Sequence, residues 1–265
     1  MWKQRVITAA VGIPVVVLAV WIGDPVFSLF IAAAALAGVF EFYHMALGPG
    51  RPLTYISLLW SLALALSPHY ADILPLVMTA AVVISLVGLL CCSPREKAFY
   101  NWAWIAAGAL YVGWMLSYWL NLRLLEGGRY WVFLAMFTTF ANDTGAFFVG
   151  RTWGKQKLAS AISPGKTWGG AVGGFLSAIV VASIVFLILN LFSALPFGYW
   201  QILPLACLIS LFAQLGDLVE SLFKRNMGVK ESGSLLPGHG GILDRFDSLI
   251  FVGAIVYYYV IWITA

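Results

Sequence analysis

Hydrophobic residues form long blocks along almost the whole chain, and short polar turns separate the blocks. A block of about 20 apolar residues is the length that an α-helix needs to cross a bilayer. The blocks do not alternate apolar and polar positions, as the strands of a membrane β-barrel would. The pattern predicts about nine transmembrane helices, at residues 6–22, 26–46, 53–67, 71–92, 99–120, 130–149, 169–192, 199–219 and 248–264.

The nine blocks leave no room for a soluble domain, so we expect residues 1–265 to form a single membrane-embedded catalytic domain. The block at 53–67 is short, and either a re-entrant segment or a full span would account for it. We find no internal repeat, which argues against a transporter built from two similar halves. The predicted fold class is an all-α polytopic integral membrane protein.

Composition agrees with this prediction, because 62% of the residues are hydrophobic and only 10% are charged. Soluble domains carry a much larger share of charge. The first apolar block is longer than the core of a cleavable signal, so we expect an uncleaved first helix. Cys91, Cys92 and Cys207 lack the spacing of a metal site or a disulfide framework, and are expected to be packing thiols.

Positive charge is distributed unevenly between alternate loops. With nine spans and a cytoplasmic N-terminus, all 15 Lys and Arg residues fall in cytoplasmic segments except Arg123 and Arg129. Because basic short loops stay in the cytoplasm, this distribution predicts an N-in/C-out topology. Two long cytoplasmic loops, at about 150–168 and 220–247, hold most of the positive charge. Anionic lipid headgroups attract such loops in any membrane protein, so the charge alone assigns no function.

Several acidic residues lie near the cytoplasmic ends of predicted helices. Asp143 lies inside the sixth block, where a carboxylate is costly and either faces a polar cavity or bonds to a neighbouring side chain. Asp217 and Glu220 are three positions apart and share a helix face. Glu220 also precedes Lys224 by four positions, the spacing of a surface ion pair, whereas Asp217 has no basic partner in the nearby sequence.

Further acids stand near the last and the second blocks. Asp244 and Asp247 follow the glycine turn "PGHGG" in the stretch "LDRFDS". Asp247 would cap the ninth helix, since aspartate satisfies free N–H groups there, or would take part in a polar site. Glu41 and His44, three positions apart, are expected to form a hydrogen-bonded structural pair.

The loop flanked by Asp217 and Asp244 has the groups that phosphate chemistry requires. It carries Lys224, Arg225, Lys230, His239 and the glycine turn. Mg²⁺ is usually bound by one or two carboxylates together with substrate phosphates, and glycines let backbone N–H groups approach phosphate oxygens. Lys and Arg neutralise phosphate charge. Because no covalent nucleophile stands out, the combination favours phosphoryl or nucleotidyl transfer.

A second candidate stretch is "SAISPGKTWGGAVGGF", at 160–175. Ser163 is predicted to cap a helix that has Pro164 at its first position. Lys166 would then lie in the first turn, where a cation opposes the helix dipole unless an anion binds nearby. The glycine pairs in this stretch have the small-xxx-small spacing of closely packed helices, namely 169/173 and 170/174.

Two long stretches resemble a known family. The runs "SLFKRNMGVKESGSLLPGHGGILDRFDS" (221–248) and "NDTGAFFVGRTWGKQKLASAISPGKTWGG" (142–170) are similar to characteristic regions of the phosphatidate cytidylyltransferase (CDP-diacylglycerol synthase) family. The nine-span pattern extends the resemblance over the whole chain. The family usually has Asp at the position of Glu231, and often has Lys and Glu at those of Gly165 and Gly169. These departures leave the roles of the three positions open.

The resemblance implies an enzyme of phospholipid synthesis that joins CTP and phosphatidic acid, giving CDP-diacylglycerol and pyrophosphate. It implies Mg²⁺ as cofactor, with room for a second cation. The lipid phosphate would attack the α-phosphorus of CTP, so no protein nucleophile is required. The expected form is a homodimer in the bacterial inner (cytoplasmic) membrane, with its active site at the cytoplasmic face and no nucleic-acid partner.

The resemblance also implies roles for individual residues. Asp217 and Asp244 match metal-binding acids, with Asp247 as a further candidate, and Lys166 matches a phosphate-neutralising residue; Asp217, Asp244 and Lys166 form the expected catalytic set. The expected substrate-binding residues are Asp143, Lys224, Arg225, Lys230, His239, Gly240, Gly241 and Arg245.

Two alternative functions stay open. A related CTP-dependent enzyme that acts on another lipid phosphate or a polyprenol would share the same headgroup site. An ion-coupled transporter would use acids such as Asp143 and Asp217, but its coupling acids should lie near the membrane midplane between broken helices. The acids here cluster at one predicted face, which favours the enzyme.

Overall fold

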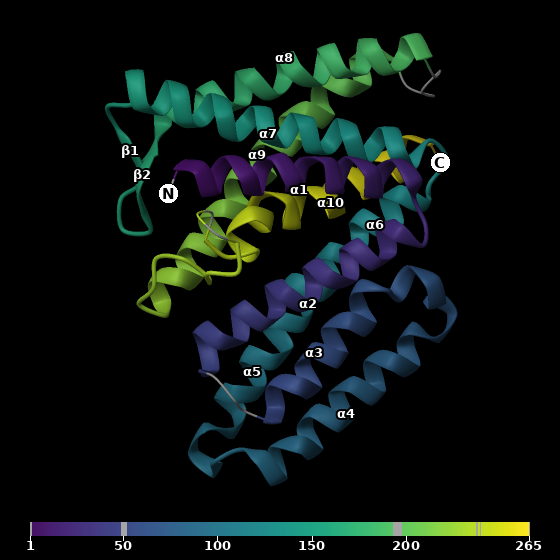
Figure 1. Ribbon diagram of the computed structural model, residues 1–265, viewed down its shortest axis with the longest axis vertical. Helices are drawn as coiled ribbons and strands as arrows, with labels where there is room; N and C mark the ends of the chain where they lie inside the picture. The colour runs from purple at the N-terminus through teal and green to yellow at the C-terminus, as the bar shows by residue number, and fades with distance from the viewer. Residues whose placement is uncertain (1, 49–51, 193–197, 237, 239, 265) are drawn as a thin grey trace. The chain divides into compact units, whose positions relative to one another are not determined.

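The computed structural model describes residues 2–48, 52–192, 198–236, 238 and 240–264, and over these residues the chain is almost entirely helical (Figure 1). Nine helical segments occupy the described ranges, if α5, η3 and α6 are counted as one. The helices are α1 (Trp2–Ile22), α2 (Val26–Leu47), α3 (Pro52–Ala65), α4 (Leu74–Cys92), α5 (Ala98–Gly108), α6 (Met115–Leu124), α7 (Gly128–Trp153), α8 (Trp168–Phe192), α9 (Tyr199–Asn226) and α10 (Leu243–Thr264). Short 3₁₀ turns, η1 (Ser67–Ile73) and η2 (Arg95–Lys97), precede α4 and α5, and a π-helical turn, η3 (Ala109–Trp114), joins α5 to α6.

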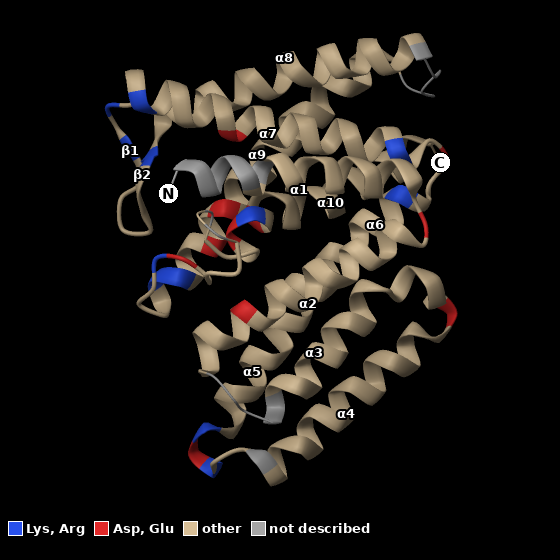
Figure 2. Ribbon diagram, viewed as in Figure 1, with Lys and Arg blue, Asp and Glu red and all other residues tan. Residues whose placement is uncertain are grey.

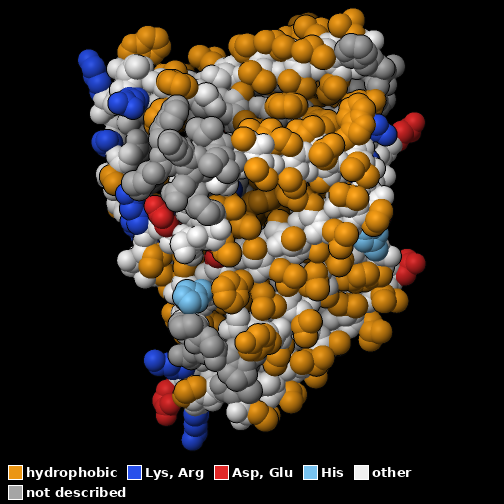
Figure 3. All heavy atoms as spheres, viewed as in Figure 1, with side chains coloured by type: hydrophobic (Ala, Val, Ile, Leu, Met, Phe, Trp, Pro, Cys, Tyr) orange, Lys and Arg blue, Asp and Glu red, His pale blue; other side chains and the backbone are white. Residues whose placement is uncertain are grey.

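The all-α membrane fold predicted from the hydrophobic blocks is confirmed. Seven of the helical segments in the described part of the chain are long and apolar enough to cross a membrane. The remaining two, Ala10–Ile22 within α1 and Thr54–Ala65 within α3, are shorter apolar helices. The shortness expected of the third block is confirmed, because α3 has only 14 residues. Hydrophobic side chains cover much of the face shown in Figure 3. Leu90, Leu191 and Trp262 are all more than 80% exposed, as suits helices that face lipid.

The chain divides into two compact units, which we describe separately. The first unit comprises Met1–Asn121 and Met227–Arg245, and α2 provides much of its core through the buried side chains of Phe27, Ile31 and Phe42. Tyr43 is also buried, and its hydroxyl donates a hydrogen bond of 2.6 Å to the carbonyl of Ile105 on α5. This packing fixes the C-terminal half of α2, where Glu41 lies.

The second unit comprises Leu122–Asn226 and Phe246–Ala265. Its helices α7 and α8 run side by side at close range because glycines line their contact (Figure 1). A β-carbon on Gly170 would lie 2.8 Å from the carbonyl of Ala146, and one on Gly174 would lie 2.8 Å from that of Asn142. The close packing predicted from the small-xxx-small pairs is therefore confirmed.

The polar segment between α7 and α8 differs from the prediction. Two short strands, β1 (Lys157–Ala159) and β2 (Ser163–Thr167), form an antiparallel hairpin there (Figure 1). The prediction that Ser163 caps a helix starting at Pro164 is wrong, because α8 starts at Trp168 and the Thr167 hydroxyl accepts the Gly170 N–H at 3.1 Å. Pro164 is tolerated because every strand of a two-stranded hairpin is an edge strand, where a missing N–H need not break the ladder.

The second polar loop is shorter than expected. The helix α9 continues to Asn226 and α10 begins at Leu243, so the irregular segment covers residues 227–242 instead of 220–247. An isolated bridge between Leu236 and Gly240 closes a turn within this segment. His239 lies outside the described residues.

Candidate active site

In the second unit, Lys166 of β2 and Asp217 of α9 form an ion pair. The Nζ atom of Lys166 lies 2.8 Å from Oδ2 of Asp217, and both side chains are partly exposed. The Ser221 hydroxyl, one turn further along α9, lies 3.4 Å from the other oxygen of Asp217. The basic partner that Asp217 lacks in the nearby sequence is thus supplied by the hairpin. Lys166 precedes α8 instead of lying in its first turn, so its cation is explained by this carboxylate and not by an opposed helix dipole.

The end of α9 also holds the hairpin in place. The Nε atom of Arg225 donates a hydrogen bond of 3.2 Å to the carbonyl of Ile162, in the turn between β1 and β2. The predicted Glu220–Lys224 ion pair is confirmed, although the Glu220 side chain is fully buried, so this is not a surface pair. Basic residues therefore lie both on the hairpin and on the C-terminal end of α9, and the two elements contact one another (Figure 2).

Asp143 lies beside a buried polar cluster that joins α7 to α9. The amide of Asn142 donates a hydrogen bond of 3.0 Å to Asp143, and its own oxygen accepts from Ser210 at 2.7 Å and Gln214 at 3.1 Å. Gln214 also donates to the carbonyl of Ala171 on α8 at 3.1 Å. The expected bond between Asp143 and a neighbouring side chain is present, while the carboxylate itself remains exposed. The three-helix cluster was not predicted.

Asp247 is not the cap of α10. The helix begins four residues earlier, at Leu243, and Oδ1 of Asp247 accepts hydrogen bonds from the N–H and hydroxyl of Ser248 at 2.6 and 3.3 Å. The α10 backbone approaches α9 closely here, since a β-carbon on Gly216 would lie 2.5 Å from the Asp247 carbonyl. Asp217 is the next residue after Gly216, so the ends of α9 and α10 bring two carboxylates into one neighbourhood.

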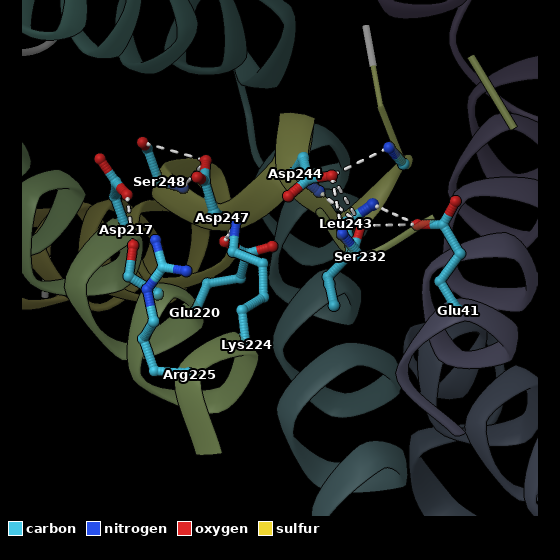
Figure 4. A network of polar contacts seen from close by, with 12 residues as sticks. Glu41, Asp217, Glu220, Lys224, Arg225, Ser232, Leu243, Asp244, Asp247 and Ser248 are labelled. Carbon is cyan, nitrogen blue, oxygen red and sulfur yellow. Dashed lines mark hydrogen bonds and ion pairs between the residues drawn. The ribbon is translucent and has the colours of Figure 1, made fainter. Parts of the chain in front are cut away.

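In the first unit, Asp244 is bonded to the segment before α10. Its Oδ2 atom accepts hydrogen bonds from the N–H groups of Ser232 and Gly241, both at 2.9 Å, and lies 3.0 Å from the Ser232 hydroxyl (Figure 4). Gly240 has a φ of 80°, a backbone conformation that favours glycine. Lys230 and Arg245 are exposed.

The expected Glu41–His44 pair is wrong. The Glu41 carboxylate is bonded instead to Ser232, Ile242 and Leu243, whereas His44 is exposed (Figure 4). The physical reason is that the N-terminus of α10 offers backbone N–H groups with a favourable dipole, which stabilise a buried carboxylate better than one histidine does. The only sign of this role in the sequence was an acidic residue within an apolar block. The sequence could not identify the hydrogen-bond partners of Glu41, because they lie about 200 positions away.

Two carboxylates near one another satisfy what Mg²⁺ usually requires. Within the described ranges, no group of three or more His, Cys, Asp or Glu side chains is arranged to bind a metal. Mg²⁺ does not need such a group, because one or two carboxylates and the phosphates of a nucleotide usually complete its coordination. Asp217 and Asp247 of the second unit are therefore chemically suited to the ion, and Asp244 of the first unit is a carboxylate of the same kind.

The fold and these polar groups define an all-helical membrane protein whose helix ends carry carboxylates, lysines and arginines suited to phosphate groups. Comparison with known proteins specifies the class further. A sequence model described as "Cytidylyltransferase family" matches residues 3–263. The chain belongs to the Cytidylyltransferase family.

Curated relatives match this chain over most of its length. It is 35% identical to "Phosphatidate cytidylyltransferase" of Bacillus subtilis (strain 168), over 97% of this chain and 96% of that protein. A protein of the same name from Brucella suis biovar 1 is 36% identical, over 96% of this chain and 92% of the relative. "Phosphatidate cytidylyltransferase 4, chloroplastic" of Arabidopsis thaliana is 35% identical, over 97% of this chain and 73% of its own length.

Proposed function

We propose that this chain is a phosphatidate cytidylyltransferase, which transfers the cytidylyl group of CTP to phosphatidic acid and releases pyrophosphate. The product is CDP-diacylglycerol, a precursor in phospholipid synthesis. The observation that carries the proposal is the similarity to enzymes of this name along nearly the entire chain. The polar groups agree with it, since phosphate-binding side chains lie at the ends of apolar helices, where a lipid phosphate and a soluble nucleotide are both accessible.

The chemistry needs no nucleophile from the protein. An oxygen of the lipid phosphate attacks the α-phosphorus of CTP and forms a new P–O bond. The bond between the α-phosphorus and the oxygen that bridges it to the β-phosphorus breaks, and pyrophosphate leaves with that oxygen. Catalysis of such a transfer consists mainly of positioning and of stabilising charge. Lys166 neutralises phosphate charge from the hairpin, and Arg225 holds the hairpin turn against α9. Asp143, Lys224, Lys230, His239, Gly240, Gly241 and Arg245 are the further substrate-binding candidates.

Asp217 and Asp244 are proposed to bind Mg²⁺, with Asp247 as a third candidate and a second cation as a further possibility. Asp217 follows Gly216, which packs against the Asp247 carbonyl, and Asp244 lies one turn before Asp247 in α10. Residues three apart in a helix share a face, which supports a common role for the two acids of α10. Mg²⁺ bound there would neutralise charge on the phosphates as pyrophosphate leaves.

The cellular setting follows from charge and family. We propose an N-in/C-out orientation in a bacterial cytoplasmic membrane, because Lys and Arg are concentrated in the segments that this orientation places inside. The polar groups would then face the cytosol, where CTP is found. A single catalytic domain is proposed because the apolar segments leave no room for a soluble one, and a homodimer is proposed on the basis of the family resemblance.

The experiment is a direct assay of the purified protein in detergent. With CTP, Mg²⁺ and phosphatidic acid, we expect equal amounts of pyrophosphate and CDP-diacylglycerol, and none when the lipid is omitted. Lysophosphatidic acid and a polyprenyl phosphate serve as alternative acceptors. Preferential use of a polyprenyl phosphate would show that this lipid, and not phosphatidic acid, is the substrate. Release of pyrophosphate without any lipid acceptor would contradict the proposed transfer.

A further inference from the structure

The buried carboxylate of Glu41, on α2, binds the start of a helix more than 200 positions further along the chain. Its Oε1 atom accepts the Ile242 N–H at 3.0 Å, and its Oε2 atom accepts the Leu243 N–H at 2.9 Å. The Ser232 hydroxyl lies 3.1 Å from Oε2. The Glu41 side chain is only 3% exposed, so these bonds replace its hydration.

These contacts make Glu41 a cap for α10. The first N–H groups of a helix have no partner within the helix, and the N-terminal end of the dipole favours a negative charge. Hydrogen bonds to a carboxylate are stronger than those to a neutral oxygen. Glu41 thus provides, from α2, what a capping residue usually provides from the preceding turn.

Ser232 connects this cap to Asp244. Its hydroxyl lies within hydrogen-bond distance of both carboxylates, at 3.1 Å from Glu41 and 3.0 Å from Asp244. A hydroxyl has one hydrogen, so it donates to one carboxylate at a time. The backbone N–H of Ser232 also donates to Asp244 at 2.9 Å. A displacement of Glu41 would therefore release Ser232 and change the surroundings of Asp244.

Two glycines make room for the Glu41 carboxylate. A β-carbon on Gly233 would lie 2.5 Å from Oε1 of Glu41, and one on Gly241 would overlap both the Glu41 carboxylate and the Ser232 hydroxyl. The sequence suggested that Gly241 serves the approach of phosphate. Its backbone N–H instead donates to Asp244 at 2.9 Å, and its missing side chain accommodates Glu41.

We propose that Glu41 is a positioning residue for the cytidylyl transfer. Through Ser232 and the first turn of α10, it fixes the Asp244 carboxylate in the orientation in which Asp244 acts on the metal and nucleotide. This inference rests on the metal-binding role proposed above for Asp244. Glu41 itself touches neither the substrate nor the metal.

The first test compares Glu41→Gln with His44→Gln. Glutamine keeps the shape of Glu41 but loses its charge, and its amide N–H₂ cannot accept the α10 donors. We expect the apparent KM for Mg²⁺ to rise roughly tenfold or more, the size of one weakened charge-assisted hydrogen bond, with a smaller change in kcat at saturating Mg²⁺. His44, exposed on the same helix, serves as the control and should leave both constants unchanged.

A second measurement uses the protein without ligands. In Glu41→Gln, amide hydrogen exchange should become faster in the segment 228–245 and stay unchanged in α7 and α8. If Glu41 only stabilised the fold, Glu41→Gln would lower Tm and speed this exchange while the KM for Mg²⁺ stayed at the wild-type value. That result would overturn the proposal.

Gly233→Ala tests the same contact without altering the carboxylate. The added methyl group displaces Glu41 from its donors, so this variant should also raise the KM for Mg²⁺. Because both changes act on one contact, the double variant should show a rise well below the product of the two single effects. A rise equal to that product would overturn the proposal. If Glu41→Gln were too unstable to assay, a wild-type KM for Mg²⁺ in Gly233→Ala would overturn it.

Asp244→Asn separates this inference from the function on which it rests. If Asp244→Asn loses activity while Glu41→Gln keeps the wild-type Mg²⁺ dependence, the positioning role of Glu41 is wrong and the proposed metal site stands. If Asp244→Asn itself keeps the wild-type Mg²⁺ dependence, the metal-binding role of Asp244 is wrong, and the inference about Glu41 falls with it.

Discussion

Lys166 and Asp217, 51 positions apart in the chain, form an ion pair of 2.8 Å between the β1–β2 hairpin and α9. The pair brings the proposed phosphate-neutralising cation next to a proposed metal-binding carboxylate. In a site that handles a polyphosphate and a divalent cation, this arrangement keeps opposite charges close together before either ligand binds.

Replacement of Lys166 tests its role toward phosphate. Lys166→Ala should reduce kcat/KM for CTP by roughly 10- to 150-fold, the value of one charge-assisted hydrogen bond. Lys157→Ala is the matched control, because Lys157 is an exposed lysine of the same hairpin. Steady-state kinetics with varied CTP measure the effect. Wild-type kinetics for Lys166→Ala would mean that this lysine is only a charge at the membrane surface.

The three aspartates of α9 and α10 should differ in their Mg²⁺ dependence. Asp217→Asn and Asp244→Asn keep the shape of each side chain but remove its charge, so both variants should insert normally and lose most activity, with partial recovery at high Mg²⁺. Asp247→Asn should be milder, because asparagine can still accept the Ser248 N–H. Turnover measured against Mg²⁺ concentration distinguishes the three. Unchanged turnover and Mg²⁺ requirement in Asp217→Asn and Asp244→Asn would exclude them as metal ligands.

The contact between α7 and α8 should not tolerate a larger residue at Gly173. A β-carbon there would overlap the Val149 side chain, so Gly173→Ala should lower the free energy of unfolding by about 1–3 kcal/mol through overpacking. Gly165→Ala is the control, since no atom would lie within 4 Å of its β-carbon. Thermal unfolding in detergent compares the two variants, and equal Tm values would argue against close α7–α8 packing.

The polar cluster at Asn142 should contribute to both stability and activity. Gln214→Leu removes hydrogen bonds to Asn142 and to the Ala171 carbonyl. Interhelical hydrogen bonds in membranes are worth about 0.6 kcal/mol on average and about 1.7 at most, so we expect a small fall in Tm. Activity should fall further than this loss explains, because Asn142 also orients Asp143. Wild-type activity in Gln214→Leu would show that this polar cluster has no role in the reaction.

The proposed orientation can be tested by cysteine labelling. In a background without Cys91, Cys92 and Cys207, a membrane-impermeant thiol reagent should label Gln156→Cys and Ser234→Cys only from the cytosolic side. Both positions are exposed in polar segments. Asp72→Cys should be labelled from outside. Labelling of Gln156→Cys from outside in intact cells would contradict the proposed topology, because the polar segments would then face away from the CTP of the cytosol.

The hydrophobic pattern was sufficient to predict where most helices lie, because the length of an apolar block depends only on local sequence. It placed the start of the last helix at residue 248, whereas α10 begins at Leu243. The extra turn is polar, and Glu41, from a distant helix, stabilises it. Hydrophobicity carries no information about such a contact.

The sequence predicted which polar residues lie near the candidate site, but it predicted fewer of the pairs that those residues form. Local rules found the Glu220–Lys224 pair, since both residues belong to one helix. They missed the Lys166–Asp217 pair, which depends on the hairpin, and they misplaced Lys166 because the Ser-Pro pair is also a common helix start. Pairs formed between elements depend on tertiary packing, which no short stretch of sequence encodes.

The lengths of α7 and α9 have a consequence for where the two substrates meet. These helices have 26 and 28 residues, which correspond to roughly 39 and 42 Å at 1.5 Å per residue, while the hydrocarbon of a bilayer is about 30 Å thick. Standing upright, each would extend about two turns into the headgroup layer, and the last two turns of α9 hold Glu220, Lys224 and Arg225. In the headgroup layer a lipid can present its phosphate while its acyl chains stay in the hydrocarbon core, and a nucleotide can bind without leaving the aqueous phase. Neither substrate has to change phase before the reaction.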